Sequence, residues 1–174
     1  FQQIPPNSTL KYILTLHDFY SKSSFKFASI LKEKGVNHFK NKDFNSAITE
    51  FQNSRSVFSN NELHVMYEFE EDKSLSFDNF SLKVFEFKQT LLLNLGNCYH
   101  KTKRFVSCID ILNSYIENAK DNEKSINPKV FYFKGLSLVE QCLKYDEKFM
   151  NYYGEAKRSY LRLVDKVPPN DPGV

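Results

Sequence analysis

The side chains that could do chemistry in this chain are few, and their spacing fits no catalytic or metal site. The three cysteines, Cys98, Cys108 and Cys142, show no Cys-x-x-Cys spacing, and their odd number favours buried free thiols. The four histidines lack the regular spacing of metal ligands, so we expect neither a metal nor a cofactor. Because no nucleophile–base pair or phosphate loop is recognisable, the pattern favours binding over catalysis.

One polar residue stands within an otherwise apolar helical pattern. Asn94 lies in LLLNLGNCYH, and an amide in the middle of a leucine-rich segment needs a hydrogen-bond partner. Lys32 and Lys129, taken alone, fit solvated surface lysines. Asn94 is therefore more informative than either lysine, and its role depends on the elements that hold it.

Length and composition fit one soluble globular domain. The chain has 174 residues, of which 41% are hydrophobic and 26% are charged, a balance that allows a real core. A net charge of +3 is too small to predict a nucleic-acid partner, which requires a concentrated basic stripe. No apolar run approaches the roughly 18–20 residues of a membrane span, and the first residues do not resemble a signal peptide. We therefore expect a cytoplasmic protein that binds neither nucleic acid nor membranes.

Small and large residues recur at matching positions in three segments. Each segment has a glycine, then a small residue, then an aromatic residue or leucine four positions further on. The three sets are Gly35, Ala47 and Phe51; Gly96, Cys108 and Leu112; and Gly135, Ala156 and Tyr160, followed by Pro168. The third set has additional residues between its glycine and its alanine. Such recurrence is typical of arrays of helical hairpins.

Close packing explains why each segment should form a pair of helices. The two small residues allow the helices of a pair to approach closely, and the large residue fills the gap between successive pairs. One pair buries only part of its apolar face, so the pairs must stack. Asn127-Pro128 is a helix start signal, an N-cap residue followed by proline. We expect helices at residues 23–40, 44–59, 79–101, 104–118, 128–146 and 149–166, with a long loop at 60–78.

The beginning of the chain has a different pattern. In IPPNSTLKYILTLHDF, residues 4–19, two prolines precede apolar residues that alternate with Lys11, Thr15 and His17, the two-residue period of a half-buried strand. A single strand leaves its backbone groups unpaired. Residues 1–20 must therefore pair with another copy, pack on the helices or leave the strand conformation, and we expect an intermolecular contact.

The recurring positions resemble the tetratricopeptide repeat over about residues 25–168. LKEKGVNHFK and LLLNLGNCYHKTKRF are similar to segments of the helical cochaperone domains of immunophilins, and IPPNSTL resembles the last strand of an FKBP-type peptidyl-prolyl isomerase domain. The resemblance implies an all-α fold of three tetratricopeptide hairpins stacked as a short right-handed solenoid, preceded by one orphan β-strand. Residues 1–20 would then end a missing isomerase domain, 21–24 would be a linker, and 169–174 a tail.

The resemblance also implies a partner and the residues that bind it. Repeat domains of this group bind the acidic C-terminal tail of heat-shock protein 90 or 70, where Lys and Asn donors hold two closely spaced carboxylates. The matching clamp residues are Lys32, Asn94, Lys129 and Lys101, with Asn37, Asn97 and Lys134 as groove neighbours. Tyr12 matches a wall of the isomerase pocket, although it fits an ordinary strand residue equally well. We expect no enzymatic activity from this chain, whereas its parent resembles a peptidyl-prolyl isomerase.

Two positions depart from the clamp pattern of the group. Val36 stands where relatives carry Asn or Thr and cannot donate a hydrogen bond, and Phe133 replaces an arginine. Phe133 also fits an apolar wall for a Val or Met of another peptide. Weakened or retuned tail binding, ordinary tail binding and a different ligand all stay open. Self-association through the orphan strand or the uncapped last repeat is a further expectation.

Overall fold

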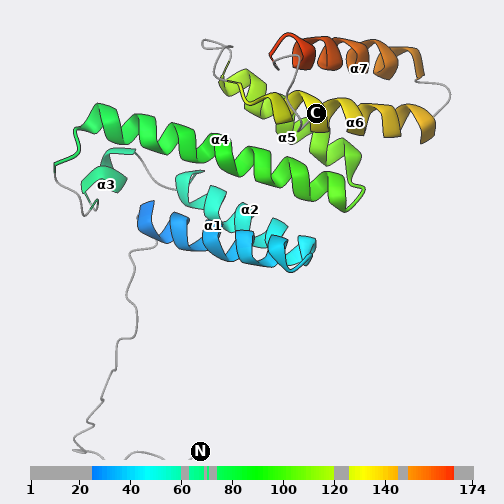
Figure 1. Ribbon diagram of the computed structural model, residues 1–174. Helices are drawn as coiled ribbons and strands as arrows, with labels where there is room; N and C mark the ends of the chain where they lie inside the picture. The colour runs from blue at the N-terminus through cyan, green and yellow to red at the C-terminus, as the bar shows by residue number, and fades with distance from the viewer. Residues whose placement is uncertain are drawn as a thin grey trace, which may run out of the picture.

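The computed structural model of the chain describes residues 25–59, 63–68, 70, 74–119, 126–144 and 149–166. Seven α-helices form in this part: α1 Phe25–Lys40, α2 Phe44–Ser59, α3 Leu63–Glu68, α4 Phe77–Lys101, α5 Phe105–Asn118, α6 Pro128–Lys144 and α7 Phe149–Val164 (Figure 1). The described residues contain no β-strand, so this part of the chain is all-α. The predicted strand at residues 1–20, with Tyr12, and the predicted linker and tail lie outside the described residues.

Six of the helices match the predicted ranges to within two residues at each end. The prediction of an unbroken loop over 60–78 is wrong, because α3 lies inside that range and α4 already begins at Phe77. Buried Met66 anchors α3, and Ser76 caps α4 by accepting a hydrogen bond from the N–H of Asn79 at 3.3 Å. A helix of six residues is too short for hydrophobic periodicity to detect.

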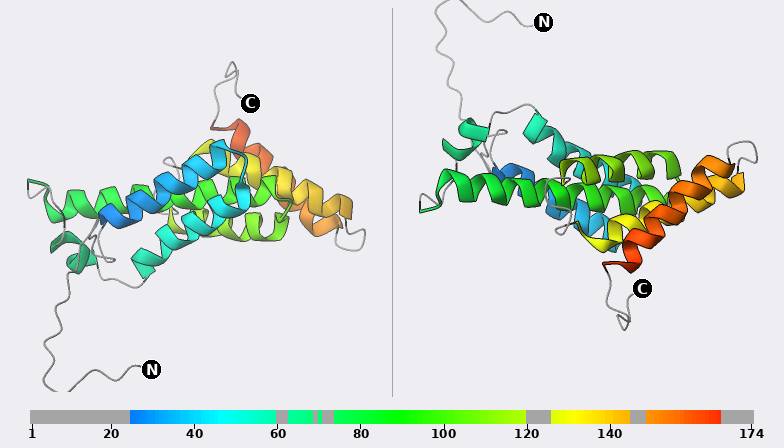
Figure 2. Two further views of the ribbon diagram at one scale, coloured as in Figure 1. Left: turned by 90° about the horizontal axis from the view of Figure 1, so that it is seen from below. Right: turned by 90° about the horizontal axis from the view of Figure 1, so that it is seen from above.

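The helices pack as consecutive pairs. α1 lies against α2, α4 against α5, and α6 against α7, while α4 also contacts α1, α2, α3 and α6. In Figure 1 the pairs follow one another from α1–α2 at the bottom to α6–α7 at the top, and Figure 2 shows the same pairs from below and from above. The long helix α4 therefore lies at the centre of the molecule and contacts the pairs on both sides.

The first two pairs have the same turn geometry. Lys42 lies in the turn between α1 and α2, and Lys103 lies in the turn between α4 and α5. Their φ angles are 62° and 58°, left-handed values that are uncommon outside glycine. Each lysine N–H donates to the carbonyl three residues earlier, Phe39 O at 2.9 Å and His100 O at 3.0 Å. A sparsely populated backbone conformation at matching positions indicates that the two pairs are built alike.

A glycine in the first helix of each pair faces a large side chain of the second helix. An added Cβ would lie 2.6 Å from the nearest facing atom at Gly35 and Gly96, and 3.2 Å from it at Gly135; the facing residues are Phe51, Leu112 and Tyr160. The predicted close approach of the two helices at the glycine is confirmed. The large residue lies against the glycine of its own pair, whereas the sequence pattern predicts that it fills the gap between pairs.

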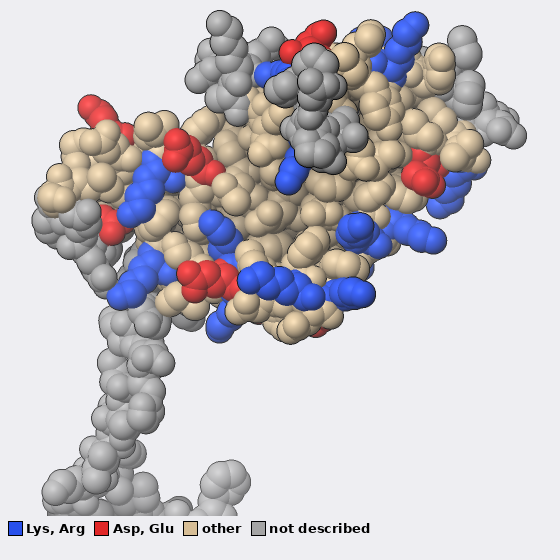
Figure 3. All heavy atoms as spheres, in the orientation of Figure 1, with Lys and Arg blue, Asp and Glu red and all other residues tan. Residues whose placement is uncertain are grey.

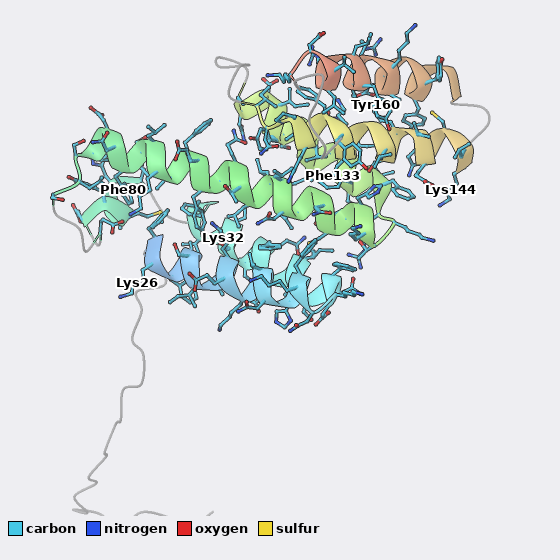
Figure 4. All side chains as sticks on the ribbon, viewed as in Figure 1. Lys26, Lys32, Phe80, Phe133, Lys144 and Tyr160 are labelled. Atoms are coloured by element: carbon cyan, nitrogen blue, oxygen red, sulfur yellow. The ribbon has the colours of Figure 1, made fainter. Side chains whose placement is uncertain are left out.

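Aromatic rings join the first pair to the beginning of α4. The Phe25 ring lies 6.3 Å from that of Phe58, 5.9 Å from that of Phe80 and 4.9 Å from that of Phe87, measured between centroids, each in an edge-to-face arrangement. These are the preferred distances and angles for aromatic pairs. Phe80 is fully buried and lies near the start of α4 (Figure 4). The cluster fixes the position of α4 relative to α1 and α2.

Candidate functional site

The predicted clamp residues lie on the first helices of the three pairs, α1, α4 and α6, which we call the A helices. α1 contacts α4, and α4 contacts α6, so the A helices are neighbours in Figure 1. Lys32 belongs to α1, Asn94 and Lys101 belong to α4, and Lys129 belongs to α6. The fold thus brings residues that are far apart in the sequence onto adjacent helices.

Lys32 is held between α1 and α4. Its side chain is partly buried, and its Nζ lies 4.6 Å from the centroid of the Phe87 ring on α4, a distance at which an aromatic face attracts a cation. Figure 4 shows Lys32 on the side of α1 that faces α4. The contact with Phe87 restrains the ammonium group near α4. A fully solvated surface lysine would have no such restraint.

Two amides lie further along α4, the helix that Lys32 contacts through Phe87. Asn94 and Asn97 are partly buried, and within the described part of the chain the buried Oδ1 of Asn97 has no hydrogen-bond partner. Lys101, one turn further along, is exposed. At about 100° per residue, these three side chains lie along one side of α4, as the sequence predicts.

Lys129 lies in the first turn of α6 and is exposed. Asn127 caps this turn, because its Oδ1 accepts a hydrogen bond from the N–H of Lys129 at 3.0 Å, as the Asn-Pro start signal predicts. Among the described residues, no hydrogen bond or ion pair joins the side chains of Lys32, Asn94 and Lys129. Their convergence on one cleft stays a prediction.

The two departures from the clamp pattern pack against the core. Val36 and Phe133 are both partly buried and lie against the main hydrophobic cluster. The Phe133 ring is 5.9 Å from the imidazole of His100 on α4, and Figure 4 shows it on the side of α6 that faces α4. In Figure 3, a few basic side chains lie in the middle of this view, separated by uncharged surface. Phe133 therefore adds apolar surface where the clamp pattern has a cation.

His100 is a polar neighbour of Phe133 that sequence reasoning missed. Its Nδ1 lies 3.1 Å from Ser137 Oγ on α6. Burial lowers the pKa of His100, nearby Lys101 lowers it further, and Glu140 opposes both effects, so the imidazole is neutral at pH 7. Ser137 is fully buried, so the pair joins α4 to α6 and does not offer an exposed nucleophile and base.

The predicted groove neighbours differ in their surroundings. Asn37 is exposed on α1. Lys134 Nζ lies 2.8 Å from Glu155 Oε1 on α7, and only 11% of the lysine side chain is exposed. A ligand carboxylate would have to compete with Glu155 for this ammonium group. Lys134 is therefore a poor substitute for the arginine that Phe133 replaces.

The cysteines are free and buried, as predicted. Burial raises the pKa of Cys98 to about 12 and that of Cys108 to about 11, so neither is a thiolate at neutral pH. Among the described residues, no group of three His, Cys, Asp or Glu side chains is placed to hold a metal ion. No helix in the same part of the chain has the length and apolar character of a membrane span.

The A helices combine partly buried amides, a restrained lysine and an apolar wall. Cationic and amide donors satisfy carboxylates, while an apolar wall suits the side chains of a peptide that carries them. Whether the A helices bind an acidic peptide stays a prediction. No protein-family model matches this chain.

Proposed function

We propose that this chain is a protein-interaction module of the cochaperone type, from the tetratricopeptide-repeat region of an FKBP-type immunophilin. The three helix pairs would be tetratricopeptide hairpins stacked as a short right-handed solenoid. The observation that carries the proposal is the recurring contact between a glycine and a large residue within each pair, at Gly35, Gly96 and Gly135. Peptidyl-prolyl isomerase activity would belong to the parent protein. Free, buried cysteines support a cytoplasmic location, where thiols stay reduced.

The proposed ligand is the acidic C-terminal tail of heat-shock protein 90 or 70, bound along the A helices. Lys32, Lys101 and Lys129 would supply positive charge, and Asn94 a neutral donor. Two carboxylates held close together are best satisfied by such a mixture, because an amide donates without adding a repelling cation. Each charge-assisted hydrogen bond contributes about 1.5–3 kcal/mol when sheltered and less when exposed. The partial burial of Lys32 and Asn94 favours the sheltered case for these two.

Tail binding is proposed to be weaker than with a complete clamp. Val36 supplies no donor, and Phe133 supplies no cation. Lys134 is already paired with Glu155. A peptide with a large apolar residue before its acidic end would recover part of the lost affinity by packing on Phe133.

Titration calorimetry with an acidic peptide ending in EEVD and with its C-terminally amidated form tests the clamp. We expect the free acid to bind at least tenfold more tightly, because the amide lacks one of the two carboxylates. Lys32→Ala should weaken binding of the free acid about tenfold. Lys34→Ala, which changes an exposed lysine on the same helix, is the matched control. Equal affinity for the two peptides, or an unaffected Lys32→Ala variant, would contradict the proposal.

Phe133→Arg tests the explanation of the weakened clamp. Restoring a cation on α6 should strengthen binding of the free acid about tenfold, since an arginine can hold a carboxylate through two parallel hydrogen bonds. The same variant should leave binding of the amidated peptide nearly unchanged. A loss of affinity for the free acid would show that Phe133 itself contacts the ligand.

A scaffold for a more apolar peptide is the second candidate function. It is favoured by the adjacent rings of Phe133 and Tyr132, which lie 5.4 Å apart, and by the 38% exposure of Tyr132. Binding of an apolar peptide without binding of either EEVD peptide would favour this function.

Self-association is favoured by Leu143 and Val164, which are 73% and 68% exposed on the last pair. Sedimentation velocity at several concentrations tests for it.

A further inference from the structure

A pocket of about 230 Å³ lies between α2, α3 and the first half of α4. Its lining consists of Phe58 from α2, Leu63 and Met66 from α3, and Ser81, Val84, Phe85 and Lys88 from α4. Pockets that bind whole small molecules typically measure about 300–1,000 Å³. This pocket is smaller, so it suits one or two side chains of a peptide better than a complete cofactor.

The pocket lies on a different side of α4 from the predicted clamp. At about 100° per residue, Phe85 projects from the side of α4 opposite Asn94, and Lys88 projects about 120° away from Asn94. The pocket also draws on α2 and α3, whereas the clamp residues belong to the A helices. A ligand in this pocket would therefore bind independently of the acidic tail.

The pocket has buried apolar walls and an apolar surface close to it. Met66 and Val84 are 1% and 2% exposed, so the walls are well packed. Phe85, another lining residue, is 39% exposed. Val65 on α3 and Leu82 on α4 are also among the exposed large apolar residues. Exposed apolar surface around a pocket is a common feature of protein-interaction sites.

One cation accompanies this apolar lining. Lys88 Nζ lies 5.2 Å from the centroid of the Phe58 ring. The residue as a whole is exposed, although the protein around it lowers the pKa of its ammonium group. No ion pair within the described residues includes Lys88. By contrast, Lys83, earlier on α4, pairs with Glu70 at 3.4 Å. An accessible ammonium group at the pocket that has no ion-pair partner among the described residues gives the site charge complementarity to an anionic ligand.

We propose that this pocket binds a segment of a partner protein that carries a large apolar side chain next to a carboxylate. The apolar side chain enters between Phe58, Met66 and Val84, and the neighbouring carboxylate pairs with Lys88. The volume limits the occupant to a side chain, and the walls select an apolar one. Lys88, the one cation among the described lining residues, selects an acidic neighbour. A buried apolar anchor with a charged contact beside it is the usual form of an interaction hot spot.

Methionine methyl NMR on the full chain tests this proposal. The chain has two methionines: Met66 lines the pocket, and Met150 belongs to α7. Labelling both methyl groups with ¹³C gives one signal for the pocket and one internal control, assigned with a Met150→Leu variant. The probe is the tetrapeptide acetyl-Gly-Phe-Asp-Gly-amide, whose blocked C-terminus offers no terminal carboxylate to the clamp. We expect a saturable shift of the Met66 signal and none of the Met150 signal.

Two matched comparisons test the role of the charge. The peptide with Asn in place of Asp should bind about twofold to fivefold more weakly, the effect of losing one exposed ion pair. Lys88→Gln should weaken binding of the Asp peptide by the same factor and abolish the difference between the two peptides. Lys83→Gln, which changes the already paired lysine of the same helix, should leave both affinities unchanged. Circular dichroism checks that each variant is folded.

Several results would overturn the proposal. A Met66 signal that does not move up to the solubility limit of the peptide means that the pocket does not bind it. Equal affinity for the Asp and Asn peptides removes the role of Lys88. Dodecanoate is the alternative probe, and saturation of the Met66 shift at a lower concentration of dodecanoate than of peptide would identify a fatty acid as the ligand. None of these results depends on whether the EEVD tail binds.

Discussion

Replacing Gly35 with alanine tests the contact on which the pairing of α1 and α2 depends. The new methyl group would lie 2.6 Å from Cε1, 2.7 Å from Cδ1 and 3.0 Å from Cζ of Phe51. Ordinary contacts of a Cβ atom lie at 3.4–4 Å. Because Phe51 is only 1% exposed, its ring cannot turn into solvent to make room. The two helices must move apart, or the ring must leave its preferred rotamer.

The magnitude follows from two opposing effects of the Gly35→Ala substitution. Alanine in a helix interior is favoured over glycine by about 0.8–1 kcal/mol. Inserting a methyl group into a well-packed core costs about 1–3 kcal/mol, and three close ring atoms place this site in the upper part of that range. We therefore expect Gly35→Ala to lower the free energy of unfolding by about 1–2 kcal/mol.

Gly154 in α7 provides the matched control. Among the described residues, a Cβ added there would meet only Arg158 Nη1, at 3.7 Å, which is the far end of a flexible side chain. Gly154→Ala should therefore raise the free energy of unfolding by about 0.5–1 kcal/mol. The same substitution thus has opposite signs at the two sites.

Urea unfolding followed by far-ultraviolet circular dichroism measures both changes. With a slope of about 2 kcal/mol/M, a loss of 1–2 kcal/mol lowers the midpoint by about 0.5–1 M. If Gly35→Ala is as stable as the unmodified chain, the close approach of α1 and α2 is wrong. Adding Phe51→Leu should recover part of the loss, because leucine is smaller than phenylalanine, and the coupling between the two changes should exceed about 0.5 kcal/mol.

Three further properties can be measured on the same protein. Ser54→Ala removes a buried hydrogen bond from Ser54 Oγ to a backbone carbonyl of α1 at 2.7 Å, so it should lower the free energy of unfolding by about 1 kcal/mol, whereas exposed Ser56→Ala should change it by less than about 0.5 kcal/mol. Because burial raises the thiol pKa of Cys98 to about 12 and that of Cys108 to about 11, both should react slowly with a thiol reagent at pH 8 until urea unfolds the chain; rapid labelling of the native protein would contradict their burial. Burial lowers the pKa of His100. Below about pH 6.5 this histidine is therefore protonated more readily in the unfolded chain than in the native state. The free energy of unfolding should fall as the pH falls through this range. His100→Gln should remove this part of the pH dependence, and an unchanged profile would show that His100 does not cause it.

The helix pairs could be predicted because their signals are local. The spacing of Gly35 and Gly96 relative to the small and large residues that follow reflects contacts within one pair, and the apolar periodicity of each helix is independent of its neighbours. The Asn127 start signal is likewise confined to one turn, and the structure places its cap where the sequence does. Short-range patterns of this kind therefore predict the bounds of most helices.

Contacts between pairs could not be predicted, because no spacing along the chain encodes them. His100 meets Ser137 across α4 and α6, and the restraint of Lys32 comes from Phe87 on another helix. α3 was missed because six residues give no measurable period. The clamp residues are predicted by a resemblance of motifs, whereas the spacing alone indicates ordinary surface lysines.

The length of α4 has a consequence for how the molecule can be divided. Its first turns are covered by Phe25 of α1, Phe58 of α2 and Tyr67 of α3, while Gly96 in its later part faces Leu112 of α5. One continuous helix of 25 residues thus packs against both the first pair, α1 and α2, and its own partner α5. The boundary between the first two helix pairs therefore lies inside a helix. Whole-repeat deletion or exchange at this boundary would cut a shared element and leave two incomplete halves, so the molecule is less modular than its recurring motifs suggest.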